Sequence, residues 1–287
     1  MIFKSLTNVV PMRIRMSYLN NWLRRNSSSV SINVEFCDGV KKITMTDQKS
    51  RNSLSLAMMQ SLLENIEKDK YNQKLRVIVL AAEGPVFSAG HNLKELAPES
   101  GRPQHEKVFQ LASKLMYSII DSPVPIVAQI NGLAAAAGCQ LVAQCDIVVC
   151  TEHSKFSTPG ANFGIFCSTP GIPLARKVQK STALNMLLTG LPISAAEALK
   201  SGLVTKVCAL EDLESEVDKI CQEIMAKSRS VIAVGKRFYY RQVELDIKKA
   251  YELGANQMVE NLQMADGKEG VRSFVEKRKP IWTHKNE

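Results

Sequence analysis

Residues 131–146 read NGLAAAAGCQLVAQCD, and this stretch decides the fold of the chain. An apolar run leads into Asn131-Gly132, small residues follow as far as Gly138, and apolar residues then recur at helical spacing. The pattern predicts a buried strand, a tight turn and a helix whose first turn carries almost no side-chain bulk. Such a helix start can offer unpaired backbone N–H groups to a negatively charged ligand atom. An alanine-rich helix packed tightly on a sheet explains the same residues equally well.

A second turn of this kind lies about forty residues earlier, where residues 83–96 read EGPVFSAGHNLKEL. It follows the continuous apolar run RVIVLA at residues 76–81, which is typical of a strand covered on both faces. Small residues lead to Gly90, and a polar, helix-like start comes next. The chain therefore contains two turns that expose backbone directly after a predicted strand.

The remaining elements alternate between strands and helices. A hairpin is predicted around Asp38-Gly39, and another buried strand at residues 147–150. This alternation indicates an α/β architecture of repeated crossover units, followed by a loop-rich segment at 156–171 and a helical end. Ser194 and Glu197 fit a capping box. Helices are expected at 54–67, 108–120, 183–189, 194–201, 213–227 and 231–263, with a last one before Pro280.

The amino-terminal segment differs from the rest in charge. Residues 1–34 hold five basic and no acidic residues, so they supply +5 of the net charge of +9 and leave +4 for the body. The segment is also rich in serine and asparagine and has apolar residues available for one face. This composition predicts a mitochondrial transit peptide; an ordinary basic tail is the alternative.

Composition excludes several classes of protein. The 287 residues, 45% of them hydrophobic, suffice for one large domain or for a core with an appendage, but no apolar run is long enough for a membrane span. Seven scattered cysteines without CxxC pairs argue for a reduced compartment. The basic residues of the body are mixed with acidic ones, so a nucleic-acid partner is not expected, and no metal site is predicted.

The two turns together resemble the signature segments of the crotonase (enoyl-CoA hydratase/isomerase) family. The likeness begins near Val34, extends to the C-terminus, and includes KSRNSL at 49–54 and KFSTPGANFGIFCSTPG at 155–171. It implies an α/β fold, a crotonase-like spiral of ββα units with a C-terminal helical trimerisation region. It divides the chain into a transit peptide at 1–33, a spiral core at 34–205 and a helical region at 206–287. Homotrimers, often paired into hexamers, are implied as well.

The resemblance also implies an acyl-CoA ligand and no permanently bound cofactor. By motif position, the family's oxyanion hole falls on the backbone N–H groups of His91 and Ala137. Two such donors stabilise an enolate or a tetrahedral oxyanion of the thioester. The family pattern lays coenzyme A along the two signature loops, and the neighbouring subunit can complete the site. The residues implied for coenzyme A are Lys49, Arg51, Asn92, Leu93, Lys94, Phe274 and Lys277.

The chain departs from the family where a hydratase needs its two glutamates. The first belongs at Gln140 and the second at Gly160, so neither carboxylate is present. A glutamine amide can orient a water molecule but cannot take its proton. Asn162 is a weak candidate for a polar substrate contact or simply a loop-forming residue. Cys139 and Cys167 are more simply explained as inert thiols than as nucleophiles.

Two classes of function therefore stay open for a mitochondrial-matrix protein of fatty acid and lipid metabolism. One is a non-catalytic acyl-CoA-binding protein. The other is an enzyme that uses the oxyanion hole without paired acids, such as a decarboxylase or a thioester hydrolase. Decarboxylation of a malonyl-type thioester mainly requires stabilisation of an enolate. A classical hydratase ranks third.

The amino-terminal composition leads to a test of localisation. A fluorescent fusion of the full chain should enter mitochondria, and a fusion that lacks residues 1–34 should stay outside, because the basic leader carries the import signal. Microscopy with a mitochondrial marker measures this. Unchanged import of the truncated fusion would show that the signal lies elsewhere.

Overall fold

The structure is a computed structural model, and it describes residues 32–285. Most of the expected transit peptide lies outside this range. The described chain forms two sheets. The six-stranded sheet has the order β1-β2-β3-β5-β7-β10, and the four-stranded sheet has the order β4-β6-β8-β9. The strands are β1 (Ile32–Cys37), β2 (Val40–Met45), β3 (Val77–Ala82), β4 (Val86–Ser88), β5 (Ile126–Ile130), β6 (Leu133–Ala135), β7 (Ile147–Thr151), β8 (Lys155–Ser157), β9 (Ile193–Ser194) and β10 (Lys206–Cys208).

The expected spiral of ββα units is visible in how consecutive strands divide between the sheets. β3, β5 and β7 join the six-stranded sheet, while the strand that follows each of them joins the four-stranded sheet. The helix that follows each pair closes the unit. All these pairings are parallel, so the carboxyl ends of β4, β6 and β8 lie at one edge. That edge is where the site residues of the two signature turns begin.

The predicted hairpin is confirmed at Asp38-Gly39. β1 and β2 pair antiparallel, with Cys37 opposite Val40. Asp38 and Gly39 have φ of 47° and 89°, the left-handed values that a two-residue hairpin turn requires. β2 then pairs parallel to β3 and joins the hairpin to the first crossover unit.

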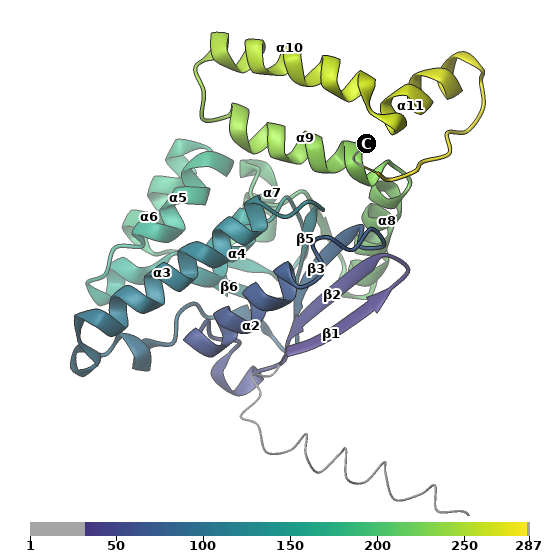
Figure 1. The fold of residues 1–287 in the computed structure, drawn as a ribbon. Coiled ribbons are helices and arrows are strands. Elements are labelled where there is room, and N and C mark those ends of the chain that lie inside the picture. The colour runs from purple at the N-terminus through teal and green to yellow at the C-terminus, as the bar shows by residue number, and fades with distance from the viewer. Residues whose placement is uncertain (1–31, 286–287) are drawn as a thin grey trace, which may run out of the picture. The chain divides into compact units, whose positions relative to one another are not determined.

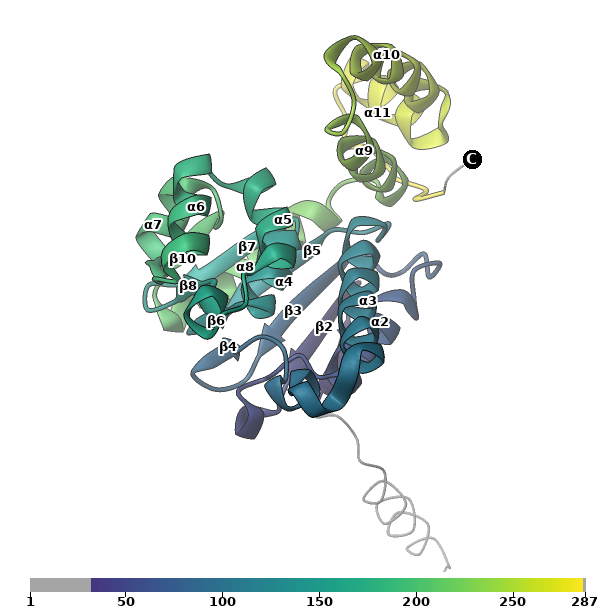
Figure 2. The same ribbon diagram turned by 90° about the vertical axis from the view of Figure 1, so that its left-hand side faces the viewer.

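Helices cover both faces of the six-stranded sheet (Figures 1 and 2). α2 and α3 lie side by side on one face, where the buried side chains of α2 include Met58 and Leu62. α8 covers the other face, and its Leu213, Val217 and Cys221 pack on valines of β3, β5 and β7. The helices are α2 (Leu56–Glu67), α3 (Gly101–Ile120), α4 (Ala137–Gln144), α5 (Ser168–Lys177), α6 (Lys180–Thr189), α7 (Ala195–Ser201), α8 (Leu213–Met225), α9 (Arg229–Gln242), α10 (Ile247–Gln263) and α11 (Ala265–Val275).

The last helices differ from the expectation in one respect. The stretch predicted as helical over 231–263 is two helices, because α9 ends at Gln242 and the Asp246 side chain accepts a hydrogen bond from the Lys249 N–H and caps a new helix. The sheet layer also continues beyond residue 205, through β10 and α8. The Ser194–Glu197 capping box at the start of α7 is present as predicted.

The C-terminal helices are held to the core through Asp146, the last residue of the second signature stretch. Its carboxylate accepts hydrogen bonds from the Ile126 N–H at 2.7 Å and the Tyr240 hydroxyl at 2.9 Å, and forms an ion pair with Lys236 at 2.8 Å. Lys236 also donates to the carbonyls of Ile119 and Val124. One carboxylate therefore joins β5 to α9. Within residues 32–285, no helix is long and apolar enough to cross a membrane.

Candidate active site at the ends of β4 and β6

The two signature turns meet because the strands that precede them are neighbours. β4 and β6 pair in parallel, with Ser88 opposite Ala134. His91 and Ala137 each follow their paired residue by three positions. A separation of more than forty residues in sequence therefore becomes a local arrangement at one sheet edge.

Gly90 is the point of contact between the turns. Its φ is 92°, and a Cβ atom there would lie 2.9 Å from the Ala136 Cβ and 3.1 Å from the Ala137 nitrogen. Gly138 is equally confined, since a Cβ atom there would lie 2.5 Å from the Ser88 carbonyl oxygen. Real Cβ atoms do not approach backbone atoms this closely. Glycine at both positions is what allows the first loop to reach the start of α4.

The Ala137 N–H lies in the first turn of α4. The first helical hydrogen bond runs from the Gln140 N–H to the Ala136 carbonyl at 3.0 Å, so the preceding N–H groups have no intrahelical acceptor. Ala136 has φ of 49° and ψ of −119°, an unusual conformation for alanine. Its N–H donates a hydrogen bond to the Ser157 carbonyl oxygen. The backbone here is turned so that α4 begins beside β8.

The His91 N–H lies on the side of its segment opposite Leu54. Leu54 and His91 form a parallel bridge, and the Leu54 N–H donates to the Gly90 carbonyl at 2.8 Å. In a parallel pairing of this register, the residues on either side of His91 make the backbone hydrogen bonds to Leu54, and His91 itself makes none. The His91 N–H therefore points away from Leu54. The two sequence-predicted donors, on His91 and Ala137, lie at one junction.

The imidazole of His91 is packed inward. Its Nδ1 lies 3.4 Å from the Leu54 carbonyl oxygen, and its ring meets the Phe109 ring edge-to-face with centroids 5.4 Å apart. Burial lowers the pKa of the imidazole, although the Leu54 carbonyl opposes this shift. The ring is therefore neutral at neutral pH. Its Nε2 is enclosed and has no hydrogen-bond partner among residues 32–285.

The loop implied for coenzyme A is bonded directly to the first signature. The Ala89 N–H donates to the Arg51 carbonyl at 3.0 Å. Asn52, with φ of 50°, donates from its side chain to the carbonyls of Glu83 and Val86, and its own carbonyl accepts from the Ser88 hydroxyl. Asn52 and Ser88 hold the loop in place. Sequence reasoning missed both, because their importance depends on these long-range bonds.

The candidate coenzyme-binding side chains of these loops are on the surface. Lys94 and Leu93 are exposed, and the Asn92 side chain accepts from the Lys94 N–H at 3.1 Å, which caps the short turn. Lys49 lies in the turn at Gln48–Ser50, and Arg51 follows it with φ of 57°. Two loops with three cationic side chains therefore stand next to each other.

Phe274 and Lys277 are in a different part of the fold. Phe274 belongs to α11 and is 85% exposed, while Lys277 follows the end of that helix. Within one chain, α11 contacts α9 and α10. A contribution of either residue to the site at β4 and β6 would come from a second subunit.

Gln140 lies in α4 one turn after Ala136 and is 5% exposed. Gly160 lies in the turn at Pro159–Phe163, where a Cβ atom would come within 2.2 Å of the Ile165 carbonyl oxygen. The Gly160 N–H donates to the Cys167 sulfur at 3.3 Å. The chain therefore packs tightly where the second glutamate of a hydratase belongs, and a carboxylate could not be added there without moving the loop.

The other polar candidates have different surroundings in the structure. Burial raises the pKa of the Cys139 thiol to about 12 and that of Cys167 above its usual value, so neither is an activated nucleophile. The Asn162 amide lies against Gly190 at the end of α6. Thr158 was not predicted; it directly follows β8, and its enclosed hydroxyl has no partner in the described range. No group of side chains in residues 32–285 could hold a metal ion.

Comparisons with known proteins identify the family of the chain. The family model for enoyl-CoA hydratase/isomerase matches residues 35–285. The human protein named enoyl-CoA hydratase domain-containing protein 3, mitochondrial, is 50% identical over 261 residues, which cover 91% of this chain and 86% of that protein. The similarly named protein of Danio rerio is 42% identical, covering 99% and 98% of the two chains.

Comparison with solved structures finds members of the same family. The crystal structure of the human enoyl-CoA hydratase domain-containing protein 3 has a TM-score of 0.86 at 50% identity and covers 88% of this chain and 100% of its own. A crystal structure of an enoyl-CoA hydratase from Mycobacterium smegmatis has a TM-score of 0.85 at 40% identity, covering 88% and 98%. The resemblance and the fold class derived from sequence are confirmed.

The packing at Gly160 leads to a prediction about stability. Gly160→Ala should lower the free energy of unfolding by about 1–3 kcal/mol, because the new methyl group overlaps the Ile165 carbonyl. Denaturant unfolding of the purified variant measures this loss.

The matched control is Gly235→Ala in α9, where a Cβ atom meets nothing within 4 Å. This change should be neutral or stabilising by up to about 1 kcal/mol, since alanine favours a helix over glycine. Equal stabilities of the two variants would contradict the tight packing at Gly160.

Proposed function

The chain belongs to the enoyl-CoA hydratase/isomerase family, and we propose that it binds the thioester of an acyl-CoA where β4, β6 and α4 meet. The observation that carries this proposal is the close approach of Gly90 to Ala136 and Ala137. This approach supports a role for the N–H groups of His91 and Ala137 as a pair of donors to one ligand atom. Their ligand would be the thioester oxygen.

The two donors would act chiefly when charge develops on that oxygen. Backbone N–H groups held by a strand and a helix need no reorganisation when the oxyanion forms, and loss of one such donor typically costs about 3 kcal/mol of barrier lowering. The α4 dipole adds a favourable field at its N-terminus. The site is therefore suited to an enolate or a tetrahedral oxyanion.

Coenzyme A would lie along the two surface loops that border the donors. Lys49, Arg51 and Lys94 are available to its phosphates, and the backbone bond between Ala89 and Arg51 keeps the loops together. Asn92 and Leu93 would border the chain of the coenzyme. Cationic side chains on adjacent loops suit a ligand with several phosphate groups.

The proposed role is binding of acyl-CoA in fatty acid and lipid metabolism, without efficient hydration. Hydration needs a base to activate water and an acid to protonate the substrate carbon. Gln140 cannot accept a proton from water, and the confined Gly160 has no room for a carboxylate. Loss of general acid–base catalysis alone removes about a hundred- to ten-thousand-fold in rate.

The second candidate is an enzyme that needs only the oxyanion donors, namely a decarboxylase or a thioester hydrolase. The observation in its favour is the buried His91, whose lowered pKa leaves the ring neutral beside the proposed donors. Decarboxylation creates an enolate without prior proton removal, so it tolerates this setting. A non-classical hydratase or isomerase is the third candidate.

Location and assembly complete the proposal. The relatives from human and Danio rerio are named mitochondrial, and together with the basic leader this supports a place in the mitochondrial matrix. A homotrimer or hexamer is supported by apolar side chains that α9, α10 and α11 leave exposed within one chain. These include Tyr239, Ile247, Tyr251, Met258, Val259, Val271, Phe274 and Val275. In such an assembly, Phe274 and Lys277 could complete a neighbour's coenzyme site.

Ala137→Pro tests the binding site directly, because proline removes the backbone N–H. The affinity for a saturated acyl-CoA should fall at least about tenfold, measured by isothermal titration calorimetry. Ala137 is the first residue of α4, a position at which proline is compatible with a helix. Circular dichroism before titration checks that the variant is folded.

The matched control is Ala195→Pro, at the corresponding first position of α7 and outside the site. It should leave acyl-CoA affinity unchanged. Equal losses in the two variants, or no loss in Ala137→Pro, would contradict an oxyanion contact at Ala137.

The unmodified protein should bind an enoyl-CoA without hydrating it. Crotonyl-CoA should bind, whereas its hydration, followed by loss of the enoyl absorbance, should be negligible because both glutamates are absent. A turnover of about 1–1000 per second, the usual range for enzymes, would mean that another residue does their work. Parallel assays on malonyl-type and simple acyl thioesters distinguish the decarboxylase and hydrolase candidates from a pure binding protein.

A further inference from the structure

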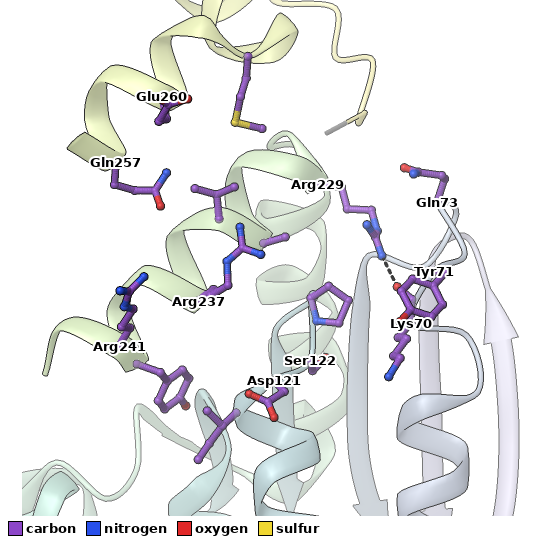
Figure 3. A pocket seen from close by; sticks show the side chains of 16 residues that line it. Lys70, Tyr71, Gln73, Asp121, Ser122, Arg229, Arg237, Arg241, Gln257 and Glu260 are labelled. Carbon is purple, nitrogen blue, oxygen red and sulfur yellow. Dashed lines mark hydrogen bonds between the residues drawn. The ribbon is translucent and has the colours of Figure 1, made fainter. Parts of the chain in front are cut away.

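A large cavity of the described chain is lined by none of the residues of the signature turns. It has a volume of about 890 Å³ and lies between α9, α10 and two loops of the core, the one after α2 and the one after α3. Figure 3 shows the side chains that line it. None of them belongs to the proposed thioester site, so the cavity needs its own explanation.

Arginines from one row of α9 line this cavity. Arg229, Ala233, Arg237 and Arg241 all border it, and each is four residues from the next. Residues at this spacing form one inclined ridge on a helix. With a rise of about 1.5 Å per residue, the row from Arg229 to Arg241 is about 18 Å long. The helix thus presents a line of guanidinium groups to one space.

Arg229 is a buried cation without a counter-ion. It is 5% exposed, and burial lowers its pKa. Its Nε donates to the Leu75 carbonyl and its Nη2 to the Lys70 carbonyl, both at 2.8 Å; the second bond is drawn in Figure 3. No carboxylate of the described chain forms an ion pair with it. Buried charges are normally paired, and carbonyl oxygens carry only partial charge.

Arg237 and Arg241 are exposed toward the cavity and are likewise not ion-paired with any carboxylate in residues 32–285. Figure 3 shows both side chains extending from α9 toward the space beside Gln257 of α10. Lys70 is a fourth cation in the lining, and the lining also contains two carboxylates, those of Asp121 and Glu260. The lining therefore has an excess of positive charge.

We propose that this cavity binds a small soluble anion with two or more phosphate groups, held by Arg229, Arg237 and Arg241. Guanidinium groups present a rigid fork of donors that matches phosphate oxygens in pairs. Arg237 and Arg241 are about 6 Å apart along α9, so their long side chains can both reach one ligand. The ligand would supply the counter-charge that Arg229 lacks.

A ligand in this position would join α9 and α10 to the core. α9 is already attached through Asp146, Lys236 and Tyr240, and Tyr240 also lines the cavity. The anion would add a second connection beside that attachment, through Arg237 and Arg241. This site shares no residue with the proposed thioester site.

Isothermal titration with pyrophosphate tests the proposal on the full chain. The unmodified protein should bind pyrophosphate saturably and more tightly than inorganic phosphate. The double variant Arg237→Ala with Arg241→Ala should lose at least about tenfold in affinity. Both side chains are exposed, so the variant should fold; Arg229 is left in place because its carbonyl bonds support the core. Arg237→Lys with Arg241→Lys, which keeps charge but not the fork, should show an intermediate loss.

A control variant removes the same charge elsewhere. Arg102→Ala with Lys114→Ala changes two exposed cations of α3 and should leave pyrophosphate affinity unchanged. The Arg237→Ala with Arg241→Ala variant should keep the acyl-CoA affinity of the unmodified protein, which separates this site from the proposed thioester site. The proposal is overturned by absence of saturable pyrophosphate binding, by equal losses of pyrophosphate affinity in the two double variants, or by a loss of acyl-CoA affinity in the Arg237 and Arg241 variant as large as its loss of pyrophosphate affinity. Binding only to vesicles that contain phosphatidic acid, and not to soluble pyrophosphate, would also overturn it.

Discussion

The contact of Gly90 with Ala136 and Ala137 is the constraint on which the rest of the site depends. A side chain at position 90 would overlap the start of α4, and a side chain at position 138 would overlap the end of β4. The small residues of the second signature are therefore a packing requirement between two parallel strands and one helix. The proposed sharing of one ligand atom by two backbone donors depends on this close contact.

The same packing logic decides the chemistry that the site can support. In a hydratase of this family, two carboxylates work beside the oxyanion donors. Here Gln140 offers only an amide, and the turn around Gly160 is closed by Ile165 and Cys167. Electrostatic stabilisation of an oxyanion and acid–base catalysis are separable contributions, and the proposed function depends only on the first.

The C-terminal helices show how one residue can serve two parts of a fold. Asp146 ends the second signature stretch, yet its carboxylate also receives Lys236 and Tyr240 of α9. The helix start at Ala137 and the attachment of α9 are thus joined through a single short helix, α4. α9 also presents the arginine row to the cavity, and no carboxylate of residues 32–285 is ion-paired with those arginines. The described residues of α10 include none that is buried.

Local sequence determined the elements of this protein, and tertiary structure decided which of them meet. The hairpin at Asp38-Gly39, the capping box at Ser194 and both signature turns could be predicted because each depends on neighbours within a few residues. The sequence also determined that two carboxylates are absent. It could not reveal the bonds of Asn52 and Ser88, the confinement of Gly160 or the unpaired charge of Arg229. Those properties depend on atoms brought close by folding from distant parts of the chain, and no local pattern encodes such distances.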